Sequence, residues 1–256
     1  MRSRLARSAP ILLRAVMVVA LAAFLARPEL FRPLLAPLCE PGQPVIYDRA
    51  DLLSLTLSHL ATVAIAIGGA TVVAVSLAIL VTRSFGAEFL PLSRSIVNIG
   101  QTFPPVAVLA LAVPVVGFGE QPTLIALFLY GLLPIFENAL TGLTRLPPAI
   151  IEAANGMGMT ETQRLWKVEA PLALPVILEG VRLSTVIGLS TATIGSTVAA
   201  KGLGEVIIAG LLSNNLSYIV QGGVVVALLA VILYDALSGV ERIFARRAGR
   251  IASEEA

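Results

Sequence analysis

The chain has 256 residues, of which 57% are hydrophobic and 13% charged, and this charged share is about half that of a typical soluble domain. A helix that crosses a bilayer needs about 20 apolar residues, so this length allows about five or six spans and little else. The sequence contains no glycine-lysine loop of the kind that binds ATP phosphates. A net charge of +2 does not indicate nucleic-acid binding, and the single cysteine, Cys39, excludes an internal disulfide.

Six apolar runs follow one another along the chain. The first, Ile11–Ala26, comes after a basic N-terminus that also fits a signal peptide, but Arg14 interrupts its apolar core, so we predict an uncleaved span. A proline-rich connection leads to the second run, Leu52–Val81. The other four runs are Ser95–Val116, Thr123–Leu143, Leu172–Ala200 and Tyr218–Val240. Prolines inside the third run predict a bend there.

The basic residues give this layout a direction. If the N-terminus is cytoplasmic and each run crosses once, only four of the 18 basic residues fall outside. These four are Arg27, Arg32, Arg49 and Lys201. The excess on the other side, which includes Arg247 and Arg250, follows the positive-inside rule and predicts that both termini are cytoplasmic.

A polar stretch between the fourth and fifth runs, Glu152–Pro171, reads EAANGMGMTETQRLWKVEAP. Pro147 and Pro148 can open a short helix, which Gly156 and Gly158 can end in a sharp turn. Thr160 with Gln163 three residues later is a capping-box pattern and predicts a second short helix. In the first helix, the small Ala153 and Ala154 permit close approach by a partner, and Glu152 gives that contact a charge.

This stretch resembles the EAA loop of ABC-transporter permeases, the cytoplasmic element that docks on the ATP-hydrolysing subunit. The family pattern is EAA, three residues, glycine, nine residues, and then isoleucine, any residue, leucine and proline. Val168 stands for the isoleucine and Ala170 for the leucine. The coupling residues that the resemblance implies are Glu152, Ala153, Ala154, Gly158, Val168 and Pro171. An ordinary cytoplasmic loop is the alternative.

The resemblance extends over roughly Tyr47 to Arg242. Segments such as Gln101-Thr102-Phe103-Pro104-Pro105 and the Gly202-Leu203-Gly204 segment are similar to those of osmoprotectant permeases, which serve importers of glycine betaine, choline and carnitine. The resemblance implies an all-α, polytopic type I importer fold with about six transmembrane helices. We expect an N-terminal helix and external connection over residues 1–50, a permease core over 51–245, and a cytoplasmic tail over 246–256.

The resemblance also implies partners and a location. The expected partners are a second permease chain, identical or a sister, two ATP-binding cassette ATPases, an external substrate-binding protein and membrane lipid, with no nucleic acid. The location is the bacterial inner membrane. No catalytic residue, cofactor or metal is expected in this chain, because ATP and Mg belong to the partner ATPase.

Polar residues inside the runs are candidates for a translocation pathway. Glu137 is costly in a membrane and therefore functional by default, or else it pairs with Arg145, Arg182 or a neighbouring chain. Gln101 and Thr193 can line a pathway, or their side chains can bond to nearby helix backbone. His59 is interpreted as a hydrogen-bonded residue near a helix end, with a proton-relay role as the alternative. The glycines Gly68, Gly69, Gly188 and Gly195 are read as close helix packing.

Other functions fit the sequence less well. A permease of this class can carry another small solute, such as an amino acid or a sulfonate. An autonomous secondary transporter should show paired broken helices or internal repeats, and it would not need the EAA loop. An intramembrane serine protease needs a late histidine, whereas His59 lies early, and no cluster of residues has zinc-ligand spacing.

Overall fold

A computed structural model of the protein describes residues 2–247 and residue 249. Most of the predicted tail over 246–256, including Arg250, lies outside the described residues. The described part of the chain consists of helices joined by turns and short loops, without a strand. The all-α prediction is therefore confirmed.

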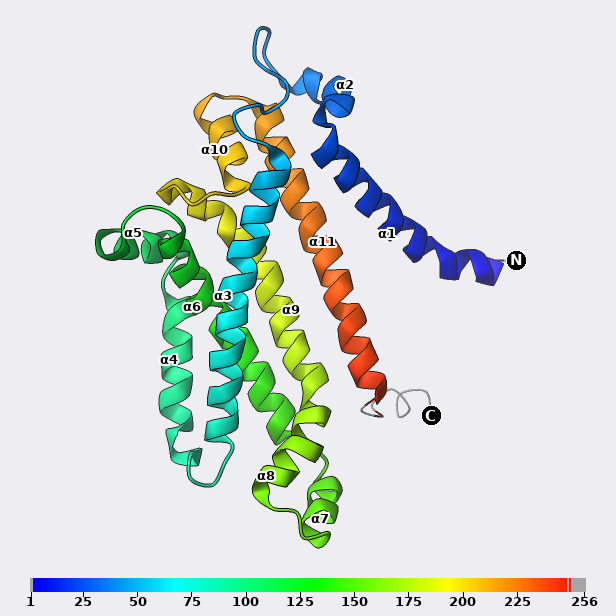
Figure 1. The fold of residues 1–256 in the computed structure, drawn as a ribbon, viewed down its shortest axis with the longest axis vertical. Helices are drawn as coiled ribbons and strands as arrows, with labels where there is room; N and C mark the ends of the chain where they lie inside the picture. Colours follow the sequence, from blue (N-terminus) through cyan, green and yellow to red (C-terminus); the bar gives the residue numbers. More distant parts are fainter. Residues whose placement is uncertain (1, 248, 250–256) are drawn as a thin grey trace. The chain divides into compact units, whose positions relative to one another are not determined.

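Five of the described helices are long (Figure 1). They are α1 (Arg2–Ala26), α3 (Leu52–Val81), α6 (Glu120–Thr144), α9 (Ala170–Gly195) and α11 (Leu216–Arg247). Shorter helices connect them: α2 (Arg32–Leu35), α4 (Leu90–Thr102), α5 (Pro105–Val116), α7 (Pro148–Gly156), α8 (Glu161–Arg164) and α10 (Gly204–Leu212). Single turns of 3-10 or π helix lie at Pro28–Phe31, Ala36–Leu38, Ala87–Phe89, Leu165–Glu169 and Ser196–Val198.

The six expected spans are only partly found among the described residues. Four helices, those containing α3, α6, α9 and α11, are long and apolar enough to cross a membrane. The apolar part of the first helix, Leu12–Ala26, is shorter than a full span. The third run is not one helix, because α4 and α5 meet at an angle of 95°. Counting this bent pair as one span gives five.

Consecutive prolines explain this break. Phe103, the last residue before Pro104, has extended backbone angles of φ −92° and ψ 138°. A residue before proline is driven out of the α-helical region, and Pro105 can then start α5 at its first position. The prolines therefore end one helix and begin another, where the sequence had predicted only a bend.

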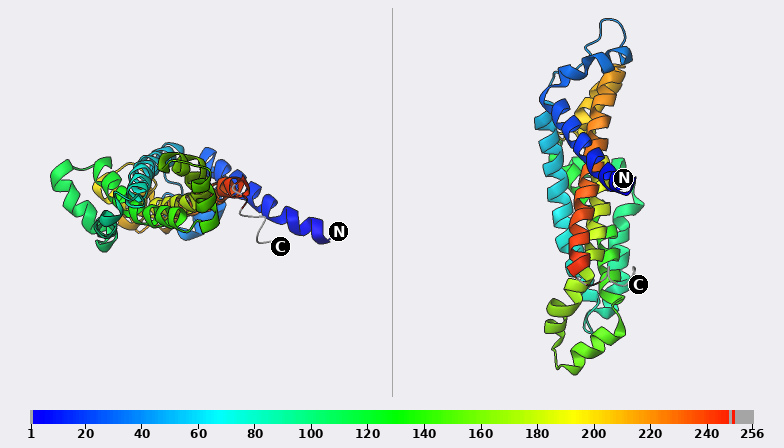
Figure 2. Two further views of the ribbon diagram at one scale, coloured as in Figure 1. Left: turned by 90° about the horizontal axis from the view of Figure 1, so that it is seen from below. Right: turned by 90° about the vertical axis from the view of Figure 1, so that its right-hand side faces the viewer.

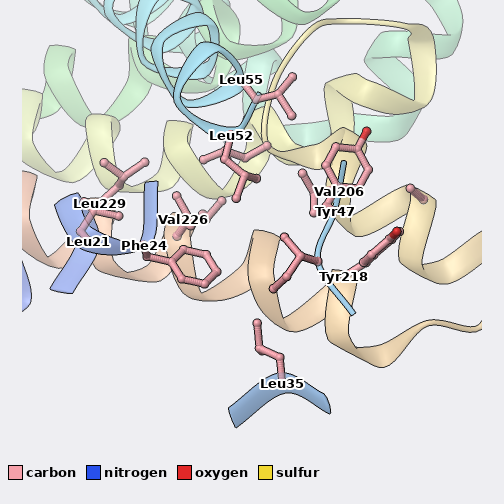
Figure 3. Packing of buried hydrophobic residues seen from close by; sticks show 14 residues of the cluster. Leu21, Phe24, Leu35, Tyr47, Leu52, Leu55, Val206, Tyr218, Val226 and Leu229 are labelled. Atoms are coloured by element: carbon pink, nitrogen blue, oxygen red, sulfur yellow. The ribbon is translucent and has the colours of Figure 1, made fainter. Parts of the chain in front are cut away.

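The described chain divides into two compact units, and four long helices, α3, α6, α9 and α11, contribute residues to both. The first unit comprises residues 1–63, 109–123 and 189–233, and the second comprises residues 64–108, 124–188 and 234–256. In the first unit, α1, α3, α10 and α11 bury a common apolar cluster that includes Leu21, Leu55, Val206 and Leu229 (Figure 3). Tyr47 packs edge-to-face on Tyr218 within this cluster, with 5.2 Å between ring centroids.

Residues 39–51, the last part of the connection before α3, form no helix or strand. Side chains of α11 and the residue before it bond their carbonyl oxygens instead. Asn215 Nδ2 donates to the Pro44 carbonyl at 2.8 Å, and Ser217 Oγ and Gln221 Nε2 donate to the Val45 carbonyl at 2.6 and 2.8 Å. These bonds satisfy polar backbone that would otherwise be buried unpaired, and they fix this connection within the first unit.

In the second unit, glycines let α6 lie against its neighbours. A Cβ atom built on Gly180 of α9 would lie 2.8 Å from the Pro134 carbonyl oxygen of α6. A Cβ on Gly100 of α4 would lie 2.5 Å from the Leu129 carbonyl oxygen. The helix backbones therefore approach as closely as small residues allow. The short helices α7 and α8 lie past the ends of α6 and α9 (Figures 1 and 2).

Candidate functional site: the loop between α6 and α9

The helix that carries Glu152, Ala153 and Ala154 is α7, and its two ends follow from local sequence. Pro147 is the N-cap and Pro148 the first helical residue, a position where the missing N–H of proline costs nothing. The helix ends at Gly156, and Gly158 follows in the left-handed region with φ +75°.

Two backbone bonds close the turn after α7. The Gly158 N–H donates to the Asn155 carbonyl at 2.9 Å, and the Met159 N–H donates to the Ala154 carbonyl at 3.2 Å. This pair of bonds is the Schellman motif, which places a glycine at the left-handed position. A side chain at Gly158 would meet open space within the chain. The glycine is therefore required by its backbone angle, as the sequence predicted, and not by crowding.

The predicted capping box is present at the next helix. Thr160 Oγ1 accepts a bond from the Gln163 N–H at 3.3 Å, and Gln163 Oε1 accepts one from the Thr160 N–H at 3.0 Å. The helix that it starts does not stand apart, however. It runs through a π-helical turn at Leu165–Glu169 directly into α9. Val168 is half-buried in this turn, and Pro171 is exposed in the first turn of α9.

The exposed surface of the loop differs in part from the prediction. Glu152 and Ala153 are exposed, but Ala154 has only 1% of its surface accessible. Ala154 therefore packs inside the loop, and the expectation that both alanines face a partner is wrong for Ala154. The sequence did not predict that two large apolar side chains of this region, Met157 and Trp166, are 69% and 64% exposed. An exposed apolar surface beside exposed charge is typical of a docking site.

A buried ionic network joins this loop to the end of α3. Glu169 Oε2 lies 2.5 Å from Arg83 Nη2, and Glu169 Oε1 lies 2.7 Å from Arg164 Nε. Arg164 Nη1 also donates to Asn155 Oδ1 of α7 at 2.8 Å. The sequence reading treated Glu169 only as a spacer between Val168 and Ala170. Its charge at the start of a span was the available signal, but its partner Arg83 lies too far away in sequence to be recognised.

The structure gives each pathway candidate a protein partner. Gln101 Nε2 donates to the Tyr130 carbonyl at 3.1 Å, and the Tyr130 hydroxyl donates to the Phe103 carbonyl. These bonds hold the C-terminal end of α4, where the helix stops before the prolines, against α6. Thr193 Oγ1 donates to the Ser190 carbonyl of its own helix at 2.7 Å. Gln101 lies in the second unit and Thr193 in the first, and these backbone bonds support structural roles for both.

Glu137 pairs with a residue that the sequence reading did not consider. Glu137 Oε1 lies 3.1 Å from Arg94 Nε of α4, so the expected pairing with Arg145 or Arg182 is wrong within this chain. Arg182 instead binds Glu241 at 2.6 Å, and it contacts Glu179 at 3.7 Å, a pairing that the sequence does allow at three residues apart. His59 is buried, with Nε2 at 3.0 Å from the Leu189 carbonyl oxygen, as expected of a hydrogen-bonded residue.

Glu137→Gln should retain most uptake. The Glu137 and Arg94 side chains are 38% and 49% exposed, and an ion pair of this kind contributes only about 0–1 kcal/mol to stability. The measurement is the initial rate of solute uptake at matched amounts of permease in the membrane. Near-complete loss of uptake, with normal assembly, would instead give the Glu137 carboxylate a direct role in the pathway.

Comparison with known proteins places the chain in a family. The family model for the binding-protein-dependent transport system inner membrane component matches residues 70–250. The chain therefore belongs to this family of inner-membrane transport components, and it is a permease subunit rather than the ATP-hydrolysing subunit. This agrees with the resemblance of the EAA stretch to ABC-transporter permeases.

Two relatives resemble most of the chain. The osmoprotectant import permease protein OsmY of Salmonella typhimurium is 42% identical over 185 residues, which cover 72% of this chain and 78% of the relative. The choline transport system permease protein OpuBB of Bacillus subtilis is 38% identical over 193 residues, which cover 75% of this chain and 88% of the relative.

A solved structure shows the same fold. A chain of the inward-facing MetNI methionine ABC transporter superposes with a TM-score of 0.68 at 22% identity, covering 75% of this chain and 95% of that chain. At this identity the likeness concerns the fold alone. The type I importer architecture implied by the EAA loop is therefore consistent with both comparisons.

Proposed function

We propose that the chain is the permease subunit of an ATP-driven importer of osmoprotectants, and that its substrates are glycine betaine, choline or related quaternary amines. The observation that carries this proposal is the 42% identity to an osmoprotectant import permease over 72% of the chain. Relatives described as choline and glycine betaine/carnitine/choline permeases support the same substrate class.

We infer that α7 and the turn after it dock on the ATPase. The docking surface consists of Glu152, Ala153, Met157 and Gly158, all exposed at one end of the second unit. Ala154 supports this surface from inside. Val168 and Pro171 lie where the loop enters α9, so they set the direction in which a displacement of the loop reaches the span.

We propose that the α4–α5 pair crosses the membrane once as a bent span. Arg83 after α3 binds Glu169 at the start of α9, and α7 follows the end of α6, so α3 and α6 end on the same side. Since α6 is long enough to cross, the chain must return between them. Arg83, Arg145 and Arg164 lie at that end, and the positive-inside rule makes it cytoplasmic.

This topology gives a labelling prediction. In a Cys39→Ser background, Arg242→Cys at the end of α11 should react with an impermeant maleimide only after the membrane is opened. Glu40→Cys in the external connection should react in intact cells. Both residues are exposed in the chain. Labelling of Arg242→Cys in intact cells would contradict the cytoplasmic assignment of the C-terminal end.

We further propose that the permease works with two ATPase subunits, a second permease chain and an external binding protein, and that ATP and Mg bind only in the ATPase. Residues 1–50 would form the N-terminal helix and external connection, residues 51–245 the permease core, and residues 246–256 the cytoplasmic tail. The family membership supports the classes of partner, and the MetNI likeness supports the fold of the core.

Uptake into proteoliposomes tests the substrate class. The permease would be reconstituted with its partner ATPase and binding protein, and ATP-dependent uptake of radiolabelled glycine betaine, choline and carnitine would be measured. The expected result is uptake of at least one of them, with methionine giving none. Uptake of methionine alone would contradict the osmoprotectant assignment.

A further inference from the structure

The ionic network of Arg83, Arg164 and Glu169, which joins the loop to α3, is more than a stabilising contact. The Arg83 and Glu169 side chains are only 10% and 5% exposed, and that of Arg164 is 20% exposed. Replacing a buried ion pair by apolar residues is often neutral or stabilising, so such a network is weak evidence for a stabilising role. The functional importance of the network depends on which helices it joins and on how its hydrogen bonds orient them.

Each oxygen of the Glu169 carboxylate binds a different element. Oε2 contacts Arg83, which follows α3, and Oε1 contacts Arg164 in α8. Arg164 continues the chain of contacts to Asn155, which is part of α7 and directly follows Ala154. A single carboxylate therefore links the proposed docking helix to two membrane helices, α3 and α9.

The π-helical turn at Leu165–Glu169 makes this geometry possible. In an α-helix, residues five positions apart point to different sides, because a turn takes 3.6 residues. The wider i→i+5 turn brings Arg164 and Glu169 to the same side of the chain, where their side chains meet at 2.7 Å. Single π turns inside helices are frequent at functional sites.

We propose that Arg83, Arg164 and Glu169 form a coupling clamp that transmits movement of α7 to α3 and α9. This inference rests on the proposed function, because it assumes that α7 docks on an ATPase. The three are positioning residues, since none of them touches substrate or nucleotide. Because one buried carboxylate binds both guanidinium groups, a displacement of either arginine acts on Glu169, and we expect α7, α3 and α9 to move as one connected group.

Glu169→Gln keeps the shape of the side chain and removes its charge. With the ATPase and binding protein in proteoliposomes, and glycine betaine as the transported probe, the amount carried per ATP hydrolysed should fall about ten-fold, the size of a typical coupling between two sites. The ATPase should still co-purify as with wild type, because the α7 surface is intact. A merely structural defect would lower uptake and hydrolysis in proportion, and this ratio would not change.

Two further variants control for misfolding and for the general effect of breaking an ion pair. Glu169→Gln leaves the buried Arg83 without its anion, so the double variant Arg83→Met with Glu169→Leu replaces this buried pair by apolar side chains, while the more exposed Arg164 keeps its bond to Asn155. In the double variant, the amount of glycine betaine transported per ATP hydrolysed should fall by the same factor. Glu241→Gln is the matched control, because it breaks the half-buried pair with Arg182 away from the loop. Its transport ratio should equal that of wild type.

The outcomes separate the two proposals. A wild-type permease that neither retains the ATPase nor drives uptake would defeat the proposed function itself. A wild-type permease that couples normally, with an unchanged transport ratio in Glu169→Gln or in the double variant, would overturn the clamp alone. An equal fall in the Glu241→Gln control would also overturn it, because any broken ion pair would then have the same effect.

Discussion

An aspartate at Ala153 should reduce uptake at least about ten-fold while the permease still accumulates in the membrane, because disruption of a hot-spot residue near the centre of an interface costs about 2 kcal/mol or more. Ala153 is exposed on α7 between Glu152 and the buried Ala154. A carboxylate at this position puts a second negative charge and extra volume on the surface proposed to enter the ATPase groove. The helix itself loses only about 0.7 kcal/mol or less on replacing alanine by aspartate.

Co-purification of the ATPase with Ala153→Asp, together with hydrolysis stimulated by the loaded binding protein, measures this effect. Ala36→Asp is the control, since Ala36 is also exposed but lies in the connection before α3. It should retain the ATPase. Wild-type docking and stimulation in Ala153→Asp would mean that α7 does not form the contact.

Ala154→Asp should act differently from Ala153→Asp. The Ala154 methyl group is buried, and a charge placed there without a partner is costly. We expect it to disorder α7 and the turn at Gly158, so docking is lost through the loop structure. Limited proteolysis of the purified permease distinguishes a changed docking surface from a disordered loop, because only Ala154→Asp should expose the loop to cleavage.

A leucine at Gly180 should prevent the permease from accumulating as a folded protein. Its Cβ would lie 2.8 Å from the Pro134 carbonyl oxygen and 3.0 Å from the Ile135 Cα. These are backbone atoms of α6, which cannot move aside as a flexible side chain would. Overpacking of a tight interface typically costs about 1–3 kcal/mol, and rigid backbone contacts place this site at the upper end or beyond.

The melting temperature in detergent and the amount of permease in membranes measure the Gly180→Leu effect. Gly68→Leu is the matched control, because Gly68 lies on α3 in the same unit, and a Cβ atom there would have nothing within 4 Å. The control should melt within a few degrees of wild type. Equal melting temperatures for the two variants would contradict the close contact between α6 and α9.

Local sequence patterns predicted the loop well because its geometry is set by neighbouring residues. Pro148, Gly158 and the capping pair Thr160 and Gln163 act within one helical turn, so their roles can be read from spacing alone. The burial of Ala154 could not be read in this way. It depends on how the turn folds back and on the packing of residues further along the chain.

Long-range contacts were the main part that the sequence did not reveal. Glu169 binds Arg83 at the end of α3, and Glu137 binds Arg94 rather than the expected Arg145 or Arg182. Close helix packing was expected both at Gly68, which is open, and at Gly195, where a Cβ would collide with the Thr123 side chain. Small size alone does not tell which glycine faces another helix.

The break between α4 and α5 is a second feature whose geometry depends on contacts that the sequence pattern does not show. The prolines predicted a bend in the third run, but the angle of 95° depends on how the two halves pack. Gln101 and Tyr130 supply contacts that hold the end of α4 against α6. A hydropathy pattern counts apolar residues and does not record such contacts, so it predicted one crossing helix.

Site-specific crosslinking from Met157 tests the central claim most directly, because this side chain is 69% exposed at the turn after α7. A photoreactive residue at Met157 should give a covalent adduct between the permease and its ATPase in membranes. The same residue at Leu34, which is 74% exposed in the external connection, should give no ATPase adduct. An ATPase adduct from Leu34 and none from Met157 would contradict the account.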